Sequence, residues 1–341
     1  MEDLPGGELQ CPKENHVSIK DEKAGDLSAD VVSGDVWEWV LPGTVLWRAR
    51  STLELLSKDS VRATVDHEEY GVKSHPREEV MQHIEGIWDA RFAANPRIFN
   101  GSKFRLADVK YGANNKEEKT LKLCIGLTNY KSFLGTNCTP DDSFYARLLD
   151  DGKCLLGVER GFIADPLGVG SITLTKDNKF LVLERSHNTS EYQGYIDPPA
   201  GHAEPARAGW DIAADVQPDK PEFESAFMKE LFFSIKDEIV QEVNLPIESL
   251  SEPLLCAVIR QVGPSRSRPN AVFLVRCNLS EAQVRELYER GGTEKDESVA
   301  LYALSRDDLV LAREKGNVNG APLTPQTRVC ISLLLSGVFE S

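Results

Sequence analysis

One long amphipathic segment in the second half of the chain constrains the fold more than any other feature. Apolar side chains recur every four residues, at Phe227, Leu231, Ile235, Ile239 and Val243. This spacing places them on one side of an α-helix. The segment is therefore predicted to be a helix that packs its apolar side against the rest of the protein.

Residues at both ends of this segment mark where the helix begins and ends. Asp219 is a good N-cap, Pro221 suits the first turn, and Glu222 is an acid near the start of the helix. Asn244 and Pro246 follow the last apolar residue and are typical of a helix end. The predicted helix thus lies between Asp219 and Asn244.

Segments with strand-like patterns surround this helix. Before it come a hairpin with its turn at Asp177 and Asn178 and a Gly/Pro-rich stretch, 192–209, that is predicted to be loop. After it the sequence predicts strands at 254–262 and 270–278, a helix at 280–292, a strand at 298–304 and a helix at 325–339. This order predicts an α/β fold in which a mixed sheet is covered by helices on both sides.

The N-terminal half shows a second pattern. A helix is predicted over 78–95, and alternating segments at 103–112 and 119–136 are predicted to be strands joined by a turn. We therefore predict three parts, namely a poorly ordered N-terminal extension with a Trp-rich insertion (1–74), a small α+β module (75–160) and a larger domain (161–341). Whether the Trp-rich segment 36–56 is a docked hairpin, a helix or an insertion stays open at this point.

Charge and cysteine content exclude several classes of protein. The 39 basic and 54 acidic side chains leave a net charge of −15, which repels a phosphate backbone, so nucleic acid is not an expected partner. The seven scattered cysteines form no C-x-x-C pair and predict neither a disulfide framework nor a zinc site. No apolar run approaches roughly 18 residues, so no membrane association is expected. The predicted location is the cytoplasm, with the nucleus as an alternative.

Two acids on the long helix are candidates for binding a metal. Glu238 and Glu242 lie four residues apart. A helix advances about 1.5 Å and about 100° per residue, so the two carboxylates lie roughly 6 Å apart along the axis and on the same side. Such a pair can share a Mg²⁺ ion, which prefers oxygen ligands. A solvated helix face is the alternative interpretation of the same spacing.

The sequence around these acids resembles the Nudix box, G-x5-E-x7-R-E-U-x-E-E-x-G-U, where U is a bulky apolar residue. Glu238, Ile239, Glu242 and Leu245 match the second half of the box. Gly201 matches the leading glycine if the loop before the helix is longer than usual. The positions that depart from the box are Lys229, Asp237, Gln241 and Asn244.

Other motifs along residues 75–341 are similar to the UDP-sugar-cleaving branch of the Nudix hydrolase family. These motifs are KFRLADV, GLTNYKSFLGTN, ADPLGVG, D-x-P-x-GHAEP and DEIVQEVNLP. The resemblance implies an α/β/α Nudix sandwich in which the N-terminal module recognises the nucleotide. It also implies Mg²⁺-dependent hydrolysis, with Mn²⁺ as an alternative ion, of the diphosphate of UDP-glucose or UDP-galactose to UMP and sugar 1-phosphate.

The resemblance also implies roles for individual residues. Glu238 and Glu242 are expected to bind the metal and to be catalytic, and Glu297 is a candidate general base. Arg185 suits the diphosphate because its guanidinium carries several donors, and aromatic residues suit a uracil ring. The expected substrate-binding residues are Phe99, Tyr130, Arg185, Ser190, Asp197, His202, Glu204 and Thr327.

Three other interpretations of the sequence remain open. The chain could hydrolyse another nucleoside diphosphate, such as ADP-ribose or a CoA derivative. Because Asp237 and Gln241 depart from the box, it could instead be a catalytically silent protein that binds nucleotide sugars. A structural interaction protein that uses the Trp-rich stretch at 36–47 is the third alternative. The sequence predicts no oligomeric state.

Overall fold

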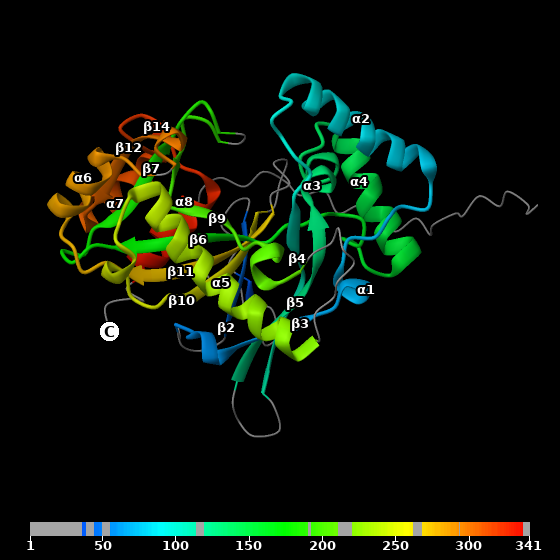
Figure 1. Cartoon of the computed structure of the whole chain (residues 1–341), viewed down its shortest axis with the longest axis horizontal. Helices are drawn as coiled ribbons and strands as arrows, with labels where there is room; N and C mark the ends of the chain where they lie inside the picture. Colours follow the sequence, from blue (N-terminus) through cyan, green and yellow to red (C-terminus); the bar gives the residue numbers. More distant parts are fainter. Residues whose placement is uncertain are drawn as a thin grey trace, which may run out of the picture.

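The structure is a computed structural model that describes residues 36–38, 44–49, 55–113, 119–189, 192–210, 220–261, 268–292 and 294–336. It contains two main sheets with helices around them (Figure 1). None of the helices in these ranges is both long enough and apolar enough to cross a lipid bilayer.

The larger sheet has nine strands and is mixed. Its main order is β1-β2-β10-β11-β6-β7-β12, with β8 paired to β7 and β9 paired to β6. Strands β11 and β6 are parallel, and the other pairs are antiparallel. The strands are β1 (Val36–Glu38), β2 (Thr44–Ala49), β6 (Gly168–Leu174), β7 (Phe180–Arg185), β8 (Ile196–Asp197), β9 (Ala200–His202), β10 (Leu254–Gln261), β11 (Pro269–Arg276) and β12 (Ser298–Leu304).

Helices cover both faces of the larger sheet, which confirms the predicted α/β class. The apolar side of α5 (Lys220–Val243) packs in one core cluster with Val169 and Phe273. The next residues along the same strands, including Val272 and Leu274, point to the other face and pack with α7 (Arg306–Lys315) and α8 (Pro325–Leu335). Figure 1 shows α5 crossing the near face of this sheet.

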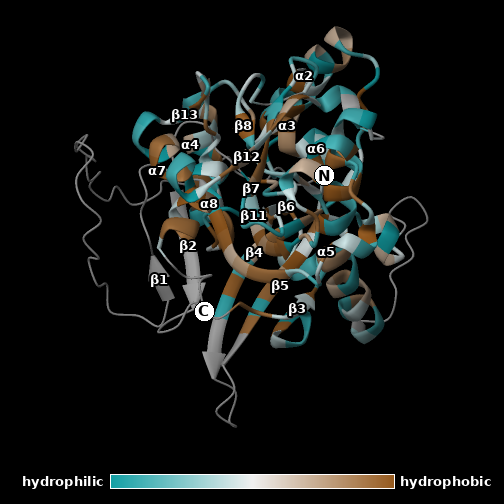
Figure 2. Cartoon of the chain, turned by 90° about the vertical axis from the view of Figure 1, so that its left-hand side faces the viewer, coloured by the Kyte–Doolittle hydropathy of each residue, from teal (hydrophilic) through white to brown (hydrophobic). Residues whose placement is uncertain are grey.

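The smaller sheet has three strands in the order β3-β5-β4. Figure 2 shows hydrophobic stretches alternating with hydrophilic ones along β4 and β5, as expected for strands that bury one face. Its strands are β3 (Val61–Val65), β4 (Ser102–Ala113) and β5 (Lys119–Asn129), and the nearby helices are α1 (His67–Tyr70), α2 (Glu78–Ala94), α3 (Tyr130–Gly135) and α4 (Asp142–Asp151).

The expected boundary at residue 74 is wrong, because the smaller sheet begins before it. Strand β3 pairs in parallel with β5, and α1 follows directly. Val61, Ala63 and Val65 are buried on alternate positions, but this run of five residues is too short to stand out in the sequence. Residues 1–35 of the predicted extension lie outside the described residues.

The Trp-rich segment contains a hairpin in the larger sheet. Strands β1 and β2 are antiparallel, and β2 continues the sheet by pairing with β10. Between the hairpin and the helix that the sequence left open, the structure has the docked hairpin, and the interpretation as an insertion stays a prediction. This segment extends the sheet on the side of β10.

The stretch 192–209 is not wholly loop, contrary to the prediction from its Gly and Pro content. It contains the two short strands β8 and β9 and a 3₁₀ turn at Pro205–Ala208. Both strands are held by pairing with β7 and β6 rather than by their own propensity. The predicted end of α5 is confirmed, since Asn244 is left-handed (φ 62°) and its N–H donates to the Val240 carbonyl.

A buried carboxylate joins the two sheets. Asp165 is fully buried in the segment between them, and it accepts hydrogen bonds from Arg160 Nε (2.6 Å), Arg260 Nη1 (2.5 Å) and Asn137 Nδ2 (2.9 Å). Arg260 comes from β10 of the larger sheet. Arg105 on β4 of the smaller sheet donates to the Ile163 carbonyl in the same region. These contacts fix the smaller sheet against the larger one.

Candidate active site

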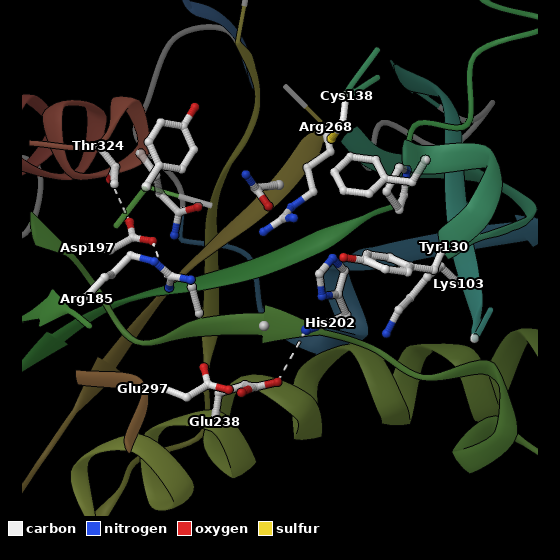
Figure 3. Close-up of a pocket in the computed structure, with 18 of the residues that line it drawn as sticks. Lys103, Tyr130, Cys138, Arg185, Asp197, His202, Glu238, Arg268, Glu297 and Thr324 are labelled. Carbon is white, nitrogen blue, oxygen red and sulfur yellow. Dashed lines mark hydrogen bonds and ion pairs between the residues drawn. The ribbon is translucent and has the colours of Figure 1, made fainter. Parts of the chain in front are cut away.

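A cavity of about 500 Å³ lies between the N-terminal module and the ends of β8, β9 and α8. Figure 3 shows its two ends. Arg185, Asp197 and Thr324 lie at one end, and Tyr130, Lys103 and His202 lie at the other. The carboxylates of Glu238 and Glu297 lie below, on the side of α5. The cavity therefore combines a polar end, a basic and aromatic end, and an acidic floor.

Three carboxylates form the acidic cluster. One oxygen each from Glu238, Glu242 and Glu294 lie within 4.8 Å of one another. The two predicted ligands stand one turn apart on α5, as the helical spacing requires. Glu294 was not predicted and comes from the segment between α6 (Glu281–Arg290) and β12. This is a donor set of hard oxygen atoms.

Strand β9 holds the acids of α5 in place through its backbone. The N–H of Ala200 donates to Glu242 Oε2 (3.1 Å), and the N–H of His202 donates to Glu238 Oε1 (3.3 Å). Because β9 is itself paired with β6, the larger sheet fixes the positions of both carboxylates. Gly201 lies between these two donors and allows the helix to approach closely.

The environment of the cluster disfavours uncompensated negative charge. Burial, followed by the carboxylate of Glu294, raises the pKa of Glu238 to about 7. Burial and then Glu238 raise the pKa of Glu242 well above its ordinary value. Burial and then Glu297 raise the pKa of Glu294. Three acids with raised pKa values and oxygen donors at this separation fit a hard divalent cation such as Mg²⁺ or Mn²⁺, whose charge would compensate theirs.

The residues that depart from the Nudix box have partners of their own. Asp237 Oδ2 accepts hydrogen bonds from Arg207 Nη1 (2.5 Å) and from Gln241 Nε2 (2.8 Å). Gln241 stands where the box has the first of its paired acids, and here its side chain bonds to Asp237. The box thus lacks that acid, while Glu238 and Glu242 are retained and meet Glu294.

Sequence reasoning also missed Glu230, a further acid on α5. This side chain is buried, and its Oε1 accepts a hydrogen bond from the N–H of Glu204 (3.0 Å), which ties the segment before α5 to the helix. The sequence does contain a signal for Glu230, because the positions of Glu230, Glu238 and Glu242 are separated by multiples of four residues and so lie on the same side of a helix. Glu294 gives no such signal, since it lies on a distant segment.

At the polar end of the cavity, Asp197 is the central residue. Its Oδ1 accepts a hydrogen bond from Thr324 Oγ1 (2.6 Å), and its Oδ2 lies 3.7 Å from Arg185 Nη1. The structure thus brings the predicted Arg185 and Asp197 together. Thr327 does not line the cavity, because it is fully buried and its Oγ1 donates to the Ile196 carbonyl (2.7 Å).

At the other end, aromatic and basic side chains surround the cavity. Tyr130 packs edge-on against Trp88, with ring centroids 6.4 Å apart. Phe99 lines the cavity and is 77% exposed. Lys103 Nζ lies 3.7 Å from a carboxylate oxygen of the predicted Glu204.

Two further predicted residues lie on the cavity wall. Burial, followed by the charges of Arg268 and Lys103, lowers the pKa of His202 well below its ordinary value, so its imidazole is neutral. Glu297 is an exposed member of the lining. Ser190 lies outside the described residues. The lining residues that the sequence did not suggest include Lys103, Arg268, Asn270, Glu294 and Gln326.

Known proteins show sequence similarity to this chain, although no family model matches it. It is 37% identical over 220 residues to uridine diphosphate glucose pyrophosphatase NUDT22 of Homo sapiens, a match that covers 64% of this chain and 70% of that protein. It is 36% identical over 231 residues to the protein of the same name from Bos taurus, covering 68% and 77% of the two chains.

The chain is also similar to a plant protein. The chain is 32% identical over 250 residues to Nudix hydrolase 9 of Arabidopsis thaliana, and the match covers 70% of this chain and 77% of the plant protein. These similarities extend over most of each relative, and the acids of the box lie at the cavity. The chain therefore belongs to the Nudix hydrolase family.

Proposed function

We propose that this protein hydrolyses the diphosphate of UDP-glucose and UDP-galactose to UMP and hexose 1-phosphate, in a reaction that depends on Mg²⁺. The observation that carries the proposal is the group of three carboxylates at a cavity with one aromatic and basic end and one polar end. Relatives whose names state UDP-glucose pyrophosphatase activity support the choice of substrate.

Glu238, Glu242 and Glu294 would hold the cation, with Mn²⁺ as an alternative to Mg²⁺. A divalent cation bound there stabilises the negative charge that develops on the phosphoryl oxygens. The backbone N–H groups of Ala200 and His202 fix two of the three acids, so the oxygen donors are already oriented before a ligand binds.

The other side chains bind and orient the substrate. Arg185 donates to the diphosphate through its guanidinium, while Phe99 and Tyr130 pack against the uracil ring. His202 is neutral and so can accept as well as donate a hydrogen bond. Asp197 and Glu204 accept hydrogen bonds from hydroxyl groups of the substrate.

Hydrolysis adds one water across the bridging P–O–P bond. The oxygen of water forms a bond to phosphorus, the bond from phosphorus to the bridging oxygen breaks, and a carboxylate facing the cavity accepts the proton of the attacking water. Glu297 is the candidate, as the sequence suggests, because it lines the cavity and is not one of the three carboxylates that would hold the cation. The bridging oxygen leaves with the other phosphate.

The alternative functions are less well supported. The names of the relatives favour UDP-sugars over ADP-ribose or CoA derivatives. A silent binding protein was suggested by Asp237 and Gln241, but these residues bond to each other, and three carboxylates are still grouped at the cavity although Gln241 stands at an acid position of the box.

One assay tests the proposal directly. The protein is incubated with UDP-glucose and Mg²⁺, with and without excess chelator, and UMP release is measured. UDP-galactose, ADP-ribose and CoA are then tested in the same way, with the nucleotide product of each substrate measured. We expect UMP from both UDP-hexoses with Mg²⁺ and none with chelator. No UMP from the unaltered protein, or faster hydrolysis of ADP-ribose or CoA, would contradict the proposed substrate.

A further inference from the structure

Among the described residues that line the cavity, one buried side-chain polar atom has no hydrogen-bond partner. Gln326 is the second residue of α8, lines the cavity, and is only 8% exposed. Its Nε2 is buried and makes no hydrogen bond. Among the described side chains, Thr128 Oγ1 is also buried without a hydrogen bond, but Thr128 does not line this cavity. A buried amide donor without a partner destabilises the protein, so such an atom at a ligand cavity points to a partner supplied by the ligand.

Two glycines on β6 make room for this side chain and for a second carboxamide. A Cβ at Gly170 would lie 1.7 Å from Gln326 Nε2, and a Cβ at Gly168 would lie 1.9 Å from Asn270 Oδ1. Neither glycine has a left-handed backbone, so the requirement is for space alone. The two carboxamides thus lie directly over the strand.

The register of β6 orders these groups along the cavity. Gly168 pairs with His202, which lies at the basic and aromatic end, and Gly170 pairs with Ala200. The two glycines are about 7 Å apart along the strand. Gln326 therefore lies on the Ala200 side and Asn270 on the His202 side. Gln326 also follows Thr324, whose hydroxyl donates to Asp197, by two residues.

The chemistry at this end suits a ring with several hydroxyl groups. A hydroxyl both donates and accepts hydrogen bonds, so it can donate to the carboxylate of Asp197 and accept from Gln326 Nε2. A uracil ring needs an aromatic side chain to pack against, and Tyr130 and Phe133 line the cavity at the opposite end.

We infer that Gln326 is a specificity-determining residue for the sugar half of the substrate, with its Nε2 donating a hydrogen bond to a hexose hydroxyl. This inference rests on the proposed hydrolysis of UDP-hexoses. It assigns the Asp197 end of the cavity to the hexose and the Tyr130 end to the uridine, with the acidic cluster beside the diphosphate between them.

The test compares ligands with and without the hexose. Gln326→Met keeps the approximate size and shape of the side chain but removes the donor. We expect the KM for UDP-glucose to rise about three- to tenfold, which is the effect of losing one hydrogen bond, while the inhibition constant of UMP stays unchanged. The melting temperature is not expected to fall, because the variant also removes a buried donor that has no partner.

Gly170→Ala provides a second, independent variant. This variant keeps glutamine at position 326 but displaces its carboxamide, since the new methyl group would occupy the position of Nε2. The same selective rise in KM is expected. Gln82→Met is the matched control, because Gln82 is an exposed residue of α2 that bonds only to Glu78 among the described residues, and it should leave both constants unchanged.

The possible results separate this inference from the function on which it rests. Equal losses for UDP-glucose and UMP in the variants would place Gln326 at the nucleotide and overturn the assignment. Unchanged constants with a lower melting temperature would show a structural role only and would also overturn it. If the unaltered protein neither binds nor hydrolyses UDP-glucose, the proposed function fails and this inference fails with it.

Discussion

Gly201 lies directly against the carboxylate of Glu238, so that a Cβ at position 201 would fall 1.8 Å from Glu238 Oε1. The backbone of Gly201 is not left-handed, so alanine is compatible with its conformation but not with the space. We expect Gly201→Ala to lower kcat by about a hundredfold or more, because it displaces by about an ångström a carboxylate that we propose to bind the metal. Steady-state kinetics with UDP-glucose measure the loss.

The matched control for this variant is Gly86→Ala. Gly86 lies on α2, and a Cβ there would meet nothing within 4 Å. Full activity and a gain of about 0.5–1 kcal/mol in the free energy of unfolding are expected, since alanine is the better helix former. Wild-type kinetics in Gly201→Ala would show that the close approach at Glu238 is not needed for turnover.

Removing one negative charge from the α5 pair should separate binding from turnover. Glu238→Gln and Glu242→Gln are each expected to lower kcat by at least about a hundredfold, because stabilisation by the cation contributes several kcal/mol. Binding of UDP-glucose, measured by calorimetry, should persist. Glu248→Gln, an exposed acid after α5, serves as the control with normal kinetics. Normal turnover in both α5 variants would remove these residues from the catalytic site.

Metal binding should be visible in thermal stability as well as in activity. Mg²⁺ is expected to raise the melting temperature of the unaltered protein, since a ligand at about one hundred times its Kd adds about 2.7 kcal/mol to the free energy of unfolding. The increase should be much smaller in Glu242→Gln, because one of the three carboxylates is lost. Thermal unfolding with Mg²⁺ and with chelator gives the comparison. An equal increase in both proteins would place the ion elsewhere.

Glu294 and Glu297 can be distinguished by the same substitution. Glu294 is part of the three-carboxylate group, whereas Glu297 lines the cavity as an exposed residue. We expect Glu294→Gln to raise the Mg²⁺ concentration needed for half-maximal activity, because it removes one of the three carboxylates proposed to hold the cation. Glu297→Gln should lower kcat at saturating Mg²⁺ without this shift, because Glu297 is proposed to accept a proton and not to hold the ion. Activity at several Mg²⁺ concentrations separates the two effects. A shifted Mg²⁺ dependence in Glu297→Gln would contradict this division of roles.

The buried Asp165 should control stability at low pH. Burial alone would raise its pKa, but the charges of Arg260, Arg160 and Arg105 outweigh burial and hold the pKa far below the ordinary value of 3.8. Below about pH 4 the unfolded chain therefore binds a proton at this residue that the folded protein does not. Stability from Asp165 is thus present above that pH and is lost as the pH falls below it.

The variant Asp165→Asn tests this effect. It should lower the free energy of unfolding by about 3–5 kcal/mol at neutral pH, because it leaves buried arginines without their counter-charge. Urea unfolding at pH 3 and pH 6 should show a smaller difference in the variant than in the unaltered protein. Asp89→Asn, an exposed residue of α2, is the control. An unchanged acid sensitivity in Asp165→Asn would contradict the assigned role.

The sequence was informative where local periodicity controls the structure. The helix α5 and its end at Asn244 were predicted from apolar spacing and from the residues at the termini, and the proximity of Glu238 and Glu242 follows from helical geometry. The short strands β3, β8 and β9 were not predicted, because each depends on a partner strand distant in sequence rather than on its own residues.

The sequence was less informative about side chains whose position depends on tertiary packing. Glu294 reaches the acids of α5 from a separate segment, and no spacing along the chain indicates this. Thr327 was expected at the substrate, but its neighbour Gln326 lines the cavity instead. Consecutive helical residues point about 100° apart, so a shift of one position exchanges a cavity residue for a core residue.

The Asp165 network also has a consequence for the cavity. It ties β4, the strand that carries Lys103, to the sheet that carries Asp197, so buried hydrogen bonds and ion pairs set the position of one end of the cavity relative to the other. A ligand that contacts both ends therefore depends on a residue that does not itself line the cavity.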